Sequence, residues 1–164
     1  MKRVDWRRIG ALTAFAVAMG HLEAVVVVYI RHILNIVPTP EQLDANVYAR
    51  VPQWIVTSEQ WREASTIIML LSLAYLVGKR PVQRLAVFLF AFGVWDIFYY
   101  VALKVLIGWP ASLATMDLLF LIPKAWFAPV WVPVGISAVM VAGGLWLLAQ
   151  GDSSFAARGR AGSE

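Results

Sequence analysis

Residues 18–31 read AMGHLEAVVVVYIR, an apolar stretch that carries a histidine and a glutamate two positions apart. The apolar run around it covers residues 9–30 and is flanked by arginines, and it is long enough to cross the roughly 30 Å of a membrane's hydrocarbon core. Charged groups are costly in hydrocarbon, so intramembrane acids normally face a protein interior. The stretch therefore predicts a membrane-spanning helix whose polar residues, His21 and Glu23, meet other helices.

The composition of the whole chain is that of a membrane protein. Hydrophobic residues make up 60% of its 164 residues, and the mean hydropathy is +0.70, far above the values of soluble domains. Cysteine is absent, which excludes disulfides and thiolate metal sites. The pI is about 9.7, but the basic residues collect at the ends of apolar segments instead of forming one binding face. We therefore predict no nucleic-acid partner.

Four apolar segments predict an all-α integral membrane protein, a four-transmembrane-helix bundle in a single domain of residues 1–150. Thr57 and Ser58 are expected to cap the second helix, and Pro133 is expected to kink the fourth. The first apolar run is too long for a signal-peptide core, so we expect it to be retained. The helices are expected over residues 6–34, 58–78, 81–107 and 126–149.

The segments between and after these helices have different expected roles. Residues 35–57 are polar and contain three prolines, which predicts a loop. The segment SLATMDLLFLIPK, residues 112–124, is too short to span and predicts a short interfacial segment between the third and fourth helices. The small, polar tail over residues 151–164 is expected to be disordered.

Positive charge predicts the orientation, because cytoplasmic loops are enriched in lysine and arginine. Nine of the 14 basic residues fall on the side of the two termini, which predicts both termini in the cytoplasm of a multi-pass protein of the cell inner (plasma) membrane, with a composition typical of bacteria. Four tryptophans are expected to form an aromatic belt at the opposite interface: Trp54, Trp61, Trp109 and Trp126.

Three of the four helices bring a carboxylate into the membrane. Glu23 and Asp96 lie near the middle of their spans, and Glu63 lies at the outer edge of the hydrocarbon. We expect these acids to converge, with His21 on a flank because it lies about 200° around the helix from Glu23. Acids gathered in a medium of low dielectric constant require a bound proton or a cation. Trp95, beside Asp96, is expected to form a wall of such a pocket. Polar contacts that merely join helices are the structural alternative.

Several segments resemble the EXPERA superfamily, which includes emopamil-binding proteins, sterol isomerases and the sigma-two receptor. LEAVVVVY, from Leu22, is similar to the first-helix segment of that superfamily. REASTIIMLLSL matches its second-helix glutamate followed by a threonine, here Glu63 and Thr66. FGVWDIFYY resembles the third-helix segment that runs from an aspartate into aromatics, here Asp96, Tyr99 and Tyr100, and WFAPVWVPVG resembles the tryptophan- and proline-containing last helix.

The resemblance implies an intramembrane pocket that holds a sterol-like or cationic amphiphile, formed by Thr66, Trp95, Asp96, Tyr99 and Tyr100. It also implies that Glu63 accepts a proton in isomerase-like chemistry, with Glu23 in support. The catalytic histidine of the isomerases precedes the first-helix glutamate by four residues, and this chain has Met19 there. His21 is the remaining candidate proton donor, although it points elsewhere on the helix.

Three functions follow as hypotheses. The first is binding of a membrane lipid or hydrophobic small molecule in an acidic and aromatic pocket, with proton transfer as an extension. The second is a metal-dependent membrane oxidoreductase using a carboxylate and histidine site, although the usual Glu-x-x-His pair is absent. The third is an accessory subunit of a larger membrane complex, or a homodimer. The sequence contains no phosphate-binding or dinucleotide motif and assigns no cofactor or metal.

Overall fold

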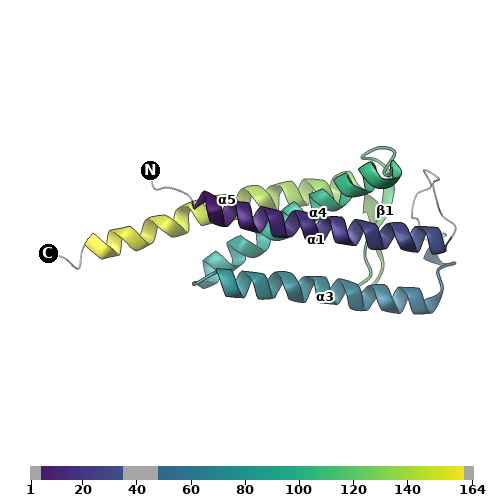
Figure 1. The fold of residues 1–164 in the computed structure, drawn as a ribbon, viewed down its shortest axis with the longest axis horizontal. Helices are drawn as coiled ribbons and strands as arrows, with labels where there is room; N and C mark the ends of the chain where they lie inside the picture. Colours follow the sequence, from purple (N-terminus) through teal and green to yellow (C-terminus); the bar gives the residue numbers. More distant parts are fainter. Residues whose placement is uncertain (1–4, 35–47, 161–164) are drawn as a thin grey trace.

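The protein is a bundle of four helices with a β-hairpin at one end. The computed structural model describes residues 5–34 and 48–160, with side chains described as far as residue 150. The helices run alternately in opposite directions, so α1 begins and α5 ends at the end that holds the α3–α4 turn, and the hairpin lies at the opposite end (Figure 1). The elements are α1 (Trp6–Ile33), α3 (Gln53–Val77), α4 (Pro81–Ile107), β1 (Met116–Phe120), β2 (Trp126–Pro129) and α5 (Trp131–Arg160).

Helix α4 is the centre of the bundle and packs against α1, α3 and α5. Glycines let the backbones approach closely along these contacts. A β-carbon on Gly93 would lie 2.5 Å from the backbone oxygen of Ser137 in α5, and one on Gly20 would lie 2.7 Å from the backbone oxygen of Trp95. These contacts fix α1 and α5 on α4 at the level of the predicted acidic residues.

Gly144 makes a third contact of this kind, and its neighbour Gly143 makes none, which allows a matched test. A β-carbon on Gly144 would lie 2.8 Å from the backbone atoms Ala86 O and Phe90 N, whereas one on Gly143 meets nothing within 4 Å. We expect Gly144→Ala to lower the free energy of unfolding by about 1–3 kcal/mol because α5 must move away from α4. Gly143→Ala is expected to be neutral or to stabilise by about 0.5 kcal/mol, since alanine favours helix. Thermal unfolding in detergent measures both, and equal shifts would contradict the close contact.

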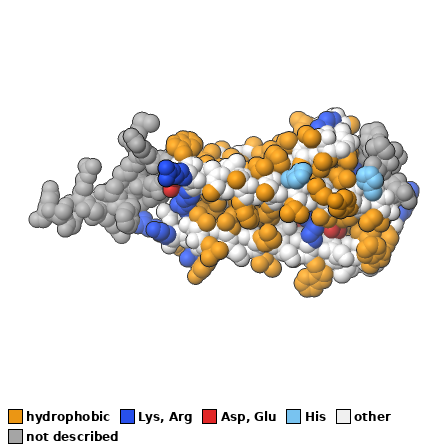
Figure 2. All heavy atoms as spheres, in the orientation of Figure 1, with side chains coloured by type: hydrophobic (Ala, Val, Ile, Leu, Met, Phe, Trp, Pro, Cys, Tyr) orange, Lys and Arg blue, Asp and Glu red, His pale blue; other side chains and the backbone are white. Residues whose placement is uncertain are grey.

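Among the described residues, three helices are long and apolar enough to cross a membrane, which indicates a membrane protein: α1, α4 and the Trp131–Gln150 part of α5. Half of the apolar window of α4 is buried, against 28% for α1 and 17% for α5, so the outer helices present apolar faces outward. Leu22, Val139 and Trp146 are among their exposed side chains. Hydrophobic side chains cover the middle of the bundle, and lysine and arginine gather toward the end where α1 begins (Figure 2).

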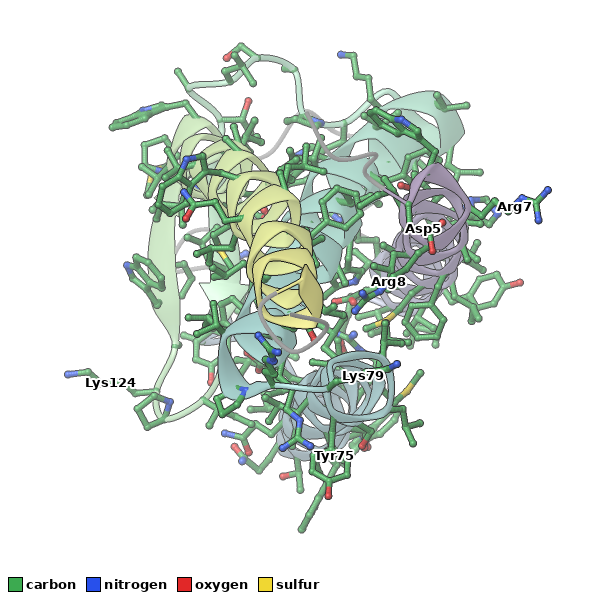
Figure 3. The ribbon with its side chains drawn as sticks, turned by 90° about the vertical axis from the view of Figure 1, so that its left-hand side faces the viewer. Asp5, Arg7, Arg8, Tyr75, Lys79 and Lys124 are labelled. Atoms are coloured by element: carbon green, nitrogen blue, oxygen red, sulfur yellow. The ribbon has the colours of Figure 1, made fainter. Side chains whose placement is uncertain are left out.

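Arg8 joins α1 to the last residue of α3 at that end. The Asp5 side chain caps α1 by accepting hydrogen bonds from the backbone N–H groups of Arg7 and Arg8. Arg8 Nη2 donates to the backbone oxygen of Val77 at 3.0 Å, whereas the Arg7 side chain points away from the bundle (Figure 3).

The predicted start of the second helix is wrong. Helix α3 begins at Gln53 with Pro52 as its N-cap, not at Ser58. Proline is favourable at a helix start because it has no backbone N–H that would need an acceptor. Ser58 lies inside the helix and donates its hydroxyl to the backbone oxygen of Trp54 at 2.8 Å. Of the predicted loop over residues 35–57, positions 35–47 lie outside the described residues.

The predicted helical bundle is confirmed in its main elements, but a short β-hairpin interrupts it, and the prediction of a fourth helix from residue 126 is wrong. Residues 126–129 pair with β1 as an antiparallel strand, and α5 begins only at Trp131. The segment expected at the interface forms β1, whose residues 117–120 line the interior of the bundle. Pairing with β2 satisfies the β1 backbone there without a helix. Pro133 lies in the first turn of α5, where its missing N–H costs no helix hydrogen bond, so its position calls for no kink.

Two further differences concern Trp109 and the tail. Trp109 is buried and packs with Tyr100 and Leu103, so it is not part of an exposed aromatic belt, unlike Trp54, Trp61 and Trp126. Helix α5 continues to Arg160 and so extends into the segment predicted to be disordered, consistent with the helix-forming alanine and arginine residues there. Residues 161–164 lie outside the described residues.

Candidate functional site

A cavity of about 290 Å³ lies between the four helices and is closed on one side by β1. This volume is near the lower end of the range for small-molecule sites. Every helix contributes side chains, and the hairpin contributes residues 117–121. The cavity brings together seven of the eight site residues predicted from the sequence: Glu23, Glu63, Thr66, Trp95, Asp96, Tyr99 and Tyr100.

His21 is the predicted site residue that the structure leaves out. Its side chain is exposed on the outside of α1 and does not line the cavity. The reason is helical geometry, because a two-residue offset from Glu23 turns the side chain to the other side of the helix. Met19, at the position of the isomerase histidine, packs against Ala16 and Trp95 in an apolar cluster. The described residues therefore place no imidazole in the cavity.

Glu23 is held by a charged network that crosses from α1 to α3 and α4. Its Oε1 lies 2.7 Å from Arg62 Nη1, and its Oε2 accepts a hydrogen bond from Trp95 Nε1 at 2.9 Å. Arg62 Nε also contacts Glu59 Oε2 at 2.9 Å. One guanidinium thus bridges two carboxylates, which offsets part of the cost of burying all three groups.

Glu63 fixes α3 to the hairpin. Both of its carboxylate oxygens accept from the backbone N–H of Leu121, at 3.2 and 3.0 Å. Thr66, one turn later, donates its hydroxyl to the backbone oxygen of Arg62. Among the described residues Glu63 makes no ion pair with a lysine or arginine, because the two ion pairs found there both belong to Arg62. Its partner is therefore a neutral donor.

Asp96 joins α4 to α5 in the same way. Its Oδ2 accepts a hydrogen bond from Ser137 Oγ at 2.8 Å, and Ser137 is almost fully buried. As with Glu63, no cation of the described residues lies within ion-pair distance. Around these two acids stand Phe92, Trp95, Tyr99 and Phe120, with Phe92 packed edge-on against Trp95. The cavity therefore combines several aromatic rings with two carboxylates that form no ion pair among the described residues.

Arg31 and Asp117 are buried residues of the cavity that the sequence analysis does not identify as site residues. Asp117 is 2% exposed and accepts a hydrogen bond from the Tyr100 hydroxyl at 2.9 Å. Burial raises the pKa of Asp117 to about 6, although the nearby Arg31 guanidinium opposes the rise. Arg31 is one of the five basic residues that the charge count places on the side opposite the termini. It continues the helix face of Glu23 two turns later, and that periodicity is the signal that places it inside.

The structure offers little support for a metal centre. No group of three histidine, aspartate or glutamate side chains converges at metal-ligand spacing within residues 5–34 and 48–150. Glu59 and Glu23 point their oxygens at Arg62, and His21 lies outside the cavity. The described side chains therefore supply no ligand set for the oxidoreductase hypothesis.

The chain was also compared with known proteins. No protein-family model, no curated protein and no solved structure matches it.

Proposed function

We propose that this is a multi-pass membrane protein whose central cavity binds an amphiphile with a cationic or proton-donating group. One observation carries the proposal: Glu63 and Asp96 line an aromatic cavity, and neither has a cationic partner among the described residues. Glu23 and Glu59, by contrast, share Arg62.

Burial of Glu63 and Asp96 favours a ligand that supplies a positive charge or a hydrogen-bond donor to these two carboxylates. A carboxylate removed from water requires a bound proton, a cation or several strong hydrogen bonds. Ser137 supplies Asp96 with one donor, and Leu121 supplies Glu63 with one. A ligand ammonium or hydroxyl group satisfies the remaining acceptor capacity, and aromatic rings such as those of Trp95 and Tyr99 attract a cation further. The apolar outer faces of α1 and α5 suit entry of such a ligand from the lipid.

The membrane arrangement forms part of the proposal. All four helices cross the membrane, with both termini in the cytoplasm of a bacterial cell, because basic residues are concentrated at that end. Helix α3 is too charged to be recognised as a span by composition, but Glu59, Arg62 and Glu63 direct their charges to partners inside the bundle. Its 25 residues give a length of about 37 Å, enough to span.

The resemblance to the EXPERA superfamily supports a sterol-like or cationic amphiphile as the ligand, because the residues that carry it, Glu23, Glu63 and Asp96, all line the cavity. Isomerase-like proton transfer has weaker support. His21 is exposed, and Met19 packs in an apolar cluster. The proposal is therefore restricted to binding.

The proposal is tested with octyltrimethylammonium, compared with the neutral octanol, on protein purified in a maltoside detergent. We expect the ammonium to bind the natural chain and raise its melting temperature. We expect Glu63→Gln and Asp96→Asn each to weaken the binding about tenfold, the equivalent of one desolvated cation contact. Titration calorimetry measures the affinities.

His21→Gln is the control, because His21 is on the same helix as Glu23 but outside the cavity. It is expected to leave the ammonium affinity unchanged. Equal ammonium affinities in the natural chain, Glu63→Gln and Asp96→Asn would remove the proposal. Equal affinities for ammonium and octanol, whose hydroxyl group is itself a proton donor, would remove the cationic ligand and leave the hydroxyl-bearing one.

A further inference from the structure

The guanidinium of Arg31 is buried at the hairpin end of the cavity with donors that have no partner. Arg31 is 3% exposed and lines the cavity. Its Nε and Nη2 are buried and make no hydrogen bond to any residue that the structure describes. A buried charged donor left unpaired is expensive, so native proteins rarely keep one without a use.

The two unpaired atoms lie on one edge of the guanidinium. Nε–H and Nη2–H point in parallel, which is the fork that binds two oxygens of a carboxylate or phosphate. The flat face is already occupied, because Arg31 Cζ lies 4.1 Å from the centroid of the Trp109 ring. Stacking of this kind fixes the plane of the guanidinium and leaves its edge available. The indole Nε1 of Trp109 is a further buried donor without a partner.

The described part of the chain does not fill this fork. The ion pairs of the described residues both belong to Arg62, so no described carboxylate oxygen lies within 4.0 Å of Arg31. Asp117 is close enough to Arg31 to interact with it electrostatically, but its Oδ2 already accepts a hydrogen bond from the Tyr100 hydroxyl. Arg31 therefore lines a cavity that also holds five carboxylates, and two of its donors are not satisfied by any described residue.

We infer that Arg31 forms a subsite for an anionic oxo group of the ligand, so that the amphiphile bound in this cavity is zwitterionic, with a phosphate at Arg31 and an ammonium group among the acids. This inference rests on the proposed function and specifies its ligand class. Asp96 and Asp117 lie on neighbouring elements on the Tyr100 side of the cavity. A headgroup whose ammonium and phosphate are a few bonds apart can therefore contact the acids and Arg31 at the same time.

The test compares octylphosphocholine with octyltrimethylammonium, which share the octyl chain and the trimethylammonium group. Octylphosphocholine has in addition a phosphate and a two-carbon linker between the chain and the ammonium. We expect the natural chain to bind octylphosphocholine about tenfold or more tightly, the effect of a two-point contact to phosphate. Arg31→Gln is expected to abolish this preference and leave the ammonium affinity within about twofold. Arg31→Lys keeps the charge and loses the fork, so it is expected to lose most of the preference.

Arg50→Gln is the matched control, since Arg50 is an exposed arginine that does not line the cavity. If Arg31→Gln does not fold, Arg31→Lys decides the test. An unchanged preference in the Arg31 variants, or no preference in the natural chain, overturns the phosphate subsite while the ammonium site stands. If Glu63→Gln leaves the ammonium affinity unchanged, the proposed function fails instead. The two failures are therefore distinguishable.

Discussion

Replacing Arg62 with methionine is expected to lower the free energy of unfolding by about 3 kcal/mol, the lower end of the cost of breaking a buried ion pair. Arg62 bridges Glu23 and Glu59 at 2.7 and 2.9 Å, with its own side chain 27% exposed. Methionine keeps much of the side-chain length and removes the charge, so two carboxylates remain in the bundle without their cation. For a chain of this size the loss corresponds to a decrease in melting temperature of about 6–12 °C, measured by thermal unfolding in detergent.

Arg7→Met is the matched control for this prediction. Arg7 points away from the bundle, so the same substitution there is expected to change the melting temperature little (Figure 3). Adding Glu23→Gln to Arg62→Met is expected to restore part of the stability, because it removes one of the two stranded charges. If Arg62→Met and Arg7→Met lose the same stability, the network does not hold α1 to α3.

The helices and the convergence of the acids were predictable because they follow from hydropathy and helical period. The α4 bounds match the predicted range, and α1 begins at the predicted residue. Glu23, Glu63 and Asp96 each belong to a different helix, and hydrocarbon gives such groups no partner except one another. Their placement around one cavity follows from that constraint.

The hairpin was not predictable from the same rules. MDLLFL, from Met116, is an apolar run too short to distinguish a strand from a piece of helix by periodicity. What selects the strand is tertiary: the backbone N–H of Leu121 meets the Glu63 carboxylate, and Asp117 meets the Tyr100 hydroxyl. Neither contact has a signature within the segment itself, so the burial of Asp117 was also missed.

Arg31 and Arg62 were misread for a related reason. Both belong to the five basic residues that the charge count places on the side opposite the termini, because arginine near the end of a span usually reaches the water. Their positions show that the depth of an arginine along a span does not by itself predict whether its side chain is exposed. Arg31 shares the face of Glu23 and stacks on Trp109, and Arg62 forms an ion pair with Glu23. Which side of the helix a residue occupies decides its burial here, and depth does not.

Asp117 is expected to make the stability of the protein fall as the pH rises. The groups that face it are the Arg31 guanidinium, the hydroxyl groups of Tyr99 and Tyr100, and Asp96. Burial raises the pKa of Asp117 from 3.8 to about 6 in the folded protein. The folded protein therefore keeps a proton that the unfolded chain releases near pH 4. The stability gained from that proton is fully present below about pH 4 and is lost as the pH rises through about 6, by roughly 2–3 kcal/mol.

Asp117→Asn isolates this contribution, because asparagine does not titrate and its oxygen still accepts from the Tyr100 hydroxyl. Melting temperatures of the natural chain and the variant are measured from pH 4.5 to 7.5, and we expect the natural chain to lose stability relative to the variant as the pH rises. Parallel curves would show that Asp117 stays ionised throughout. Arg31→Gln provides a second check, because loss of the nearby cation raises the pKa of Asp117 further and moves the decrease to higher pH. A decrease at unchanged pH would mean that Arg31 and Asp117 do not interact.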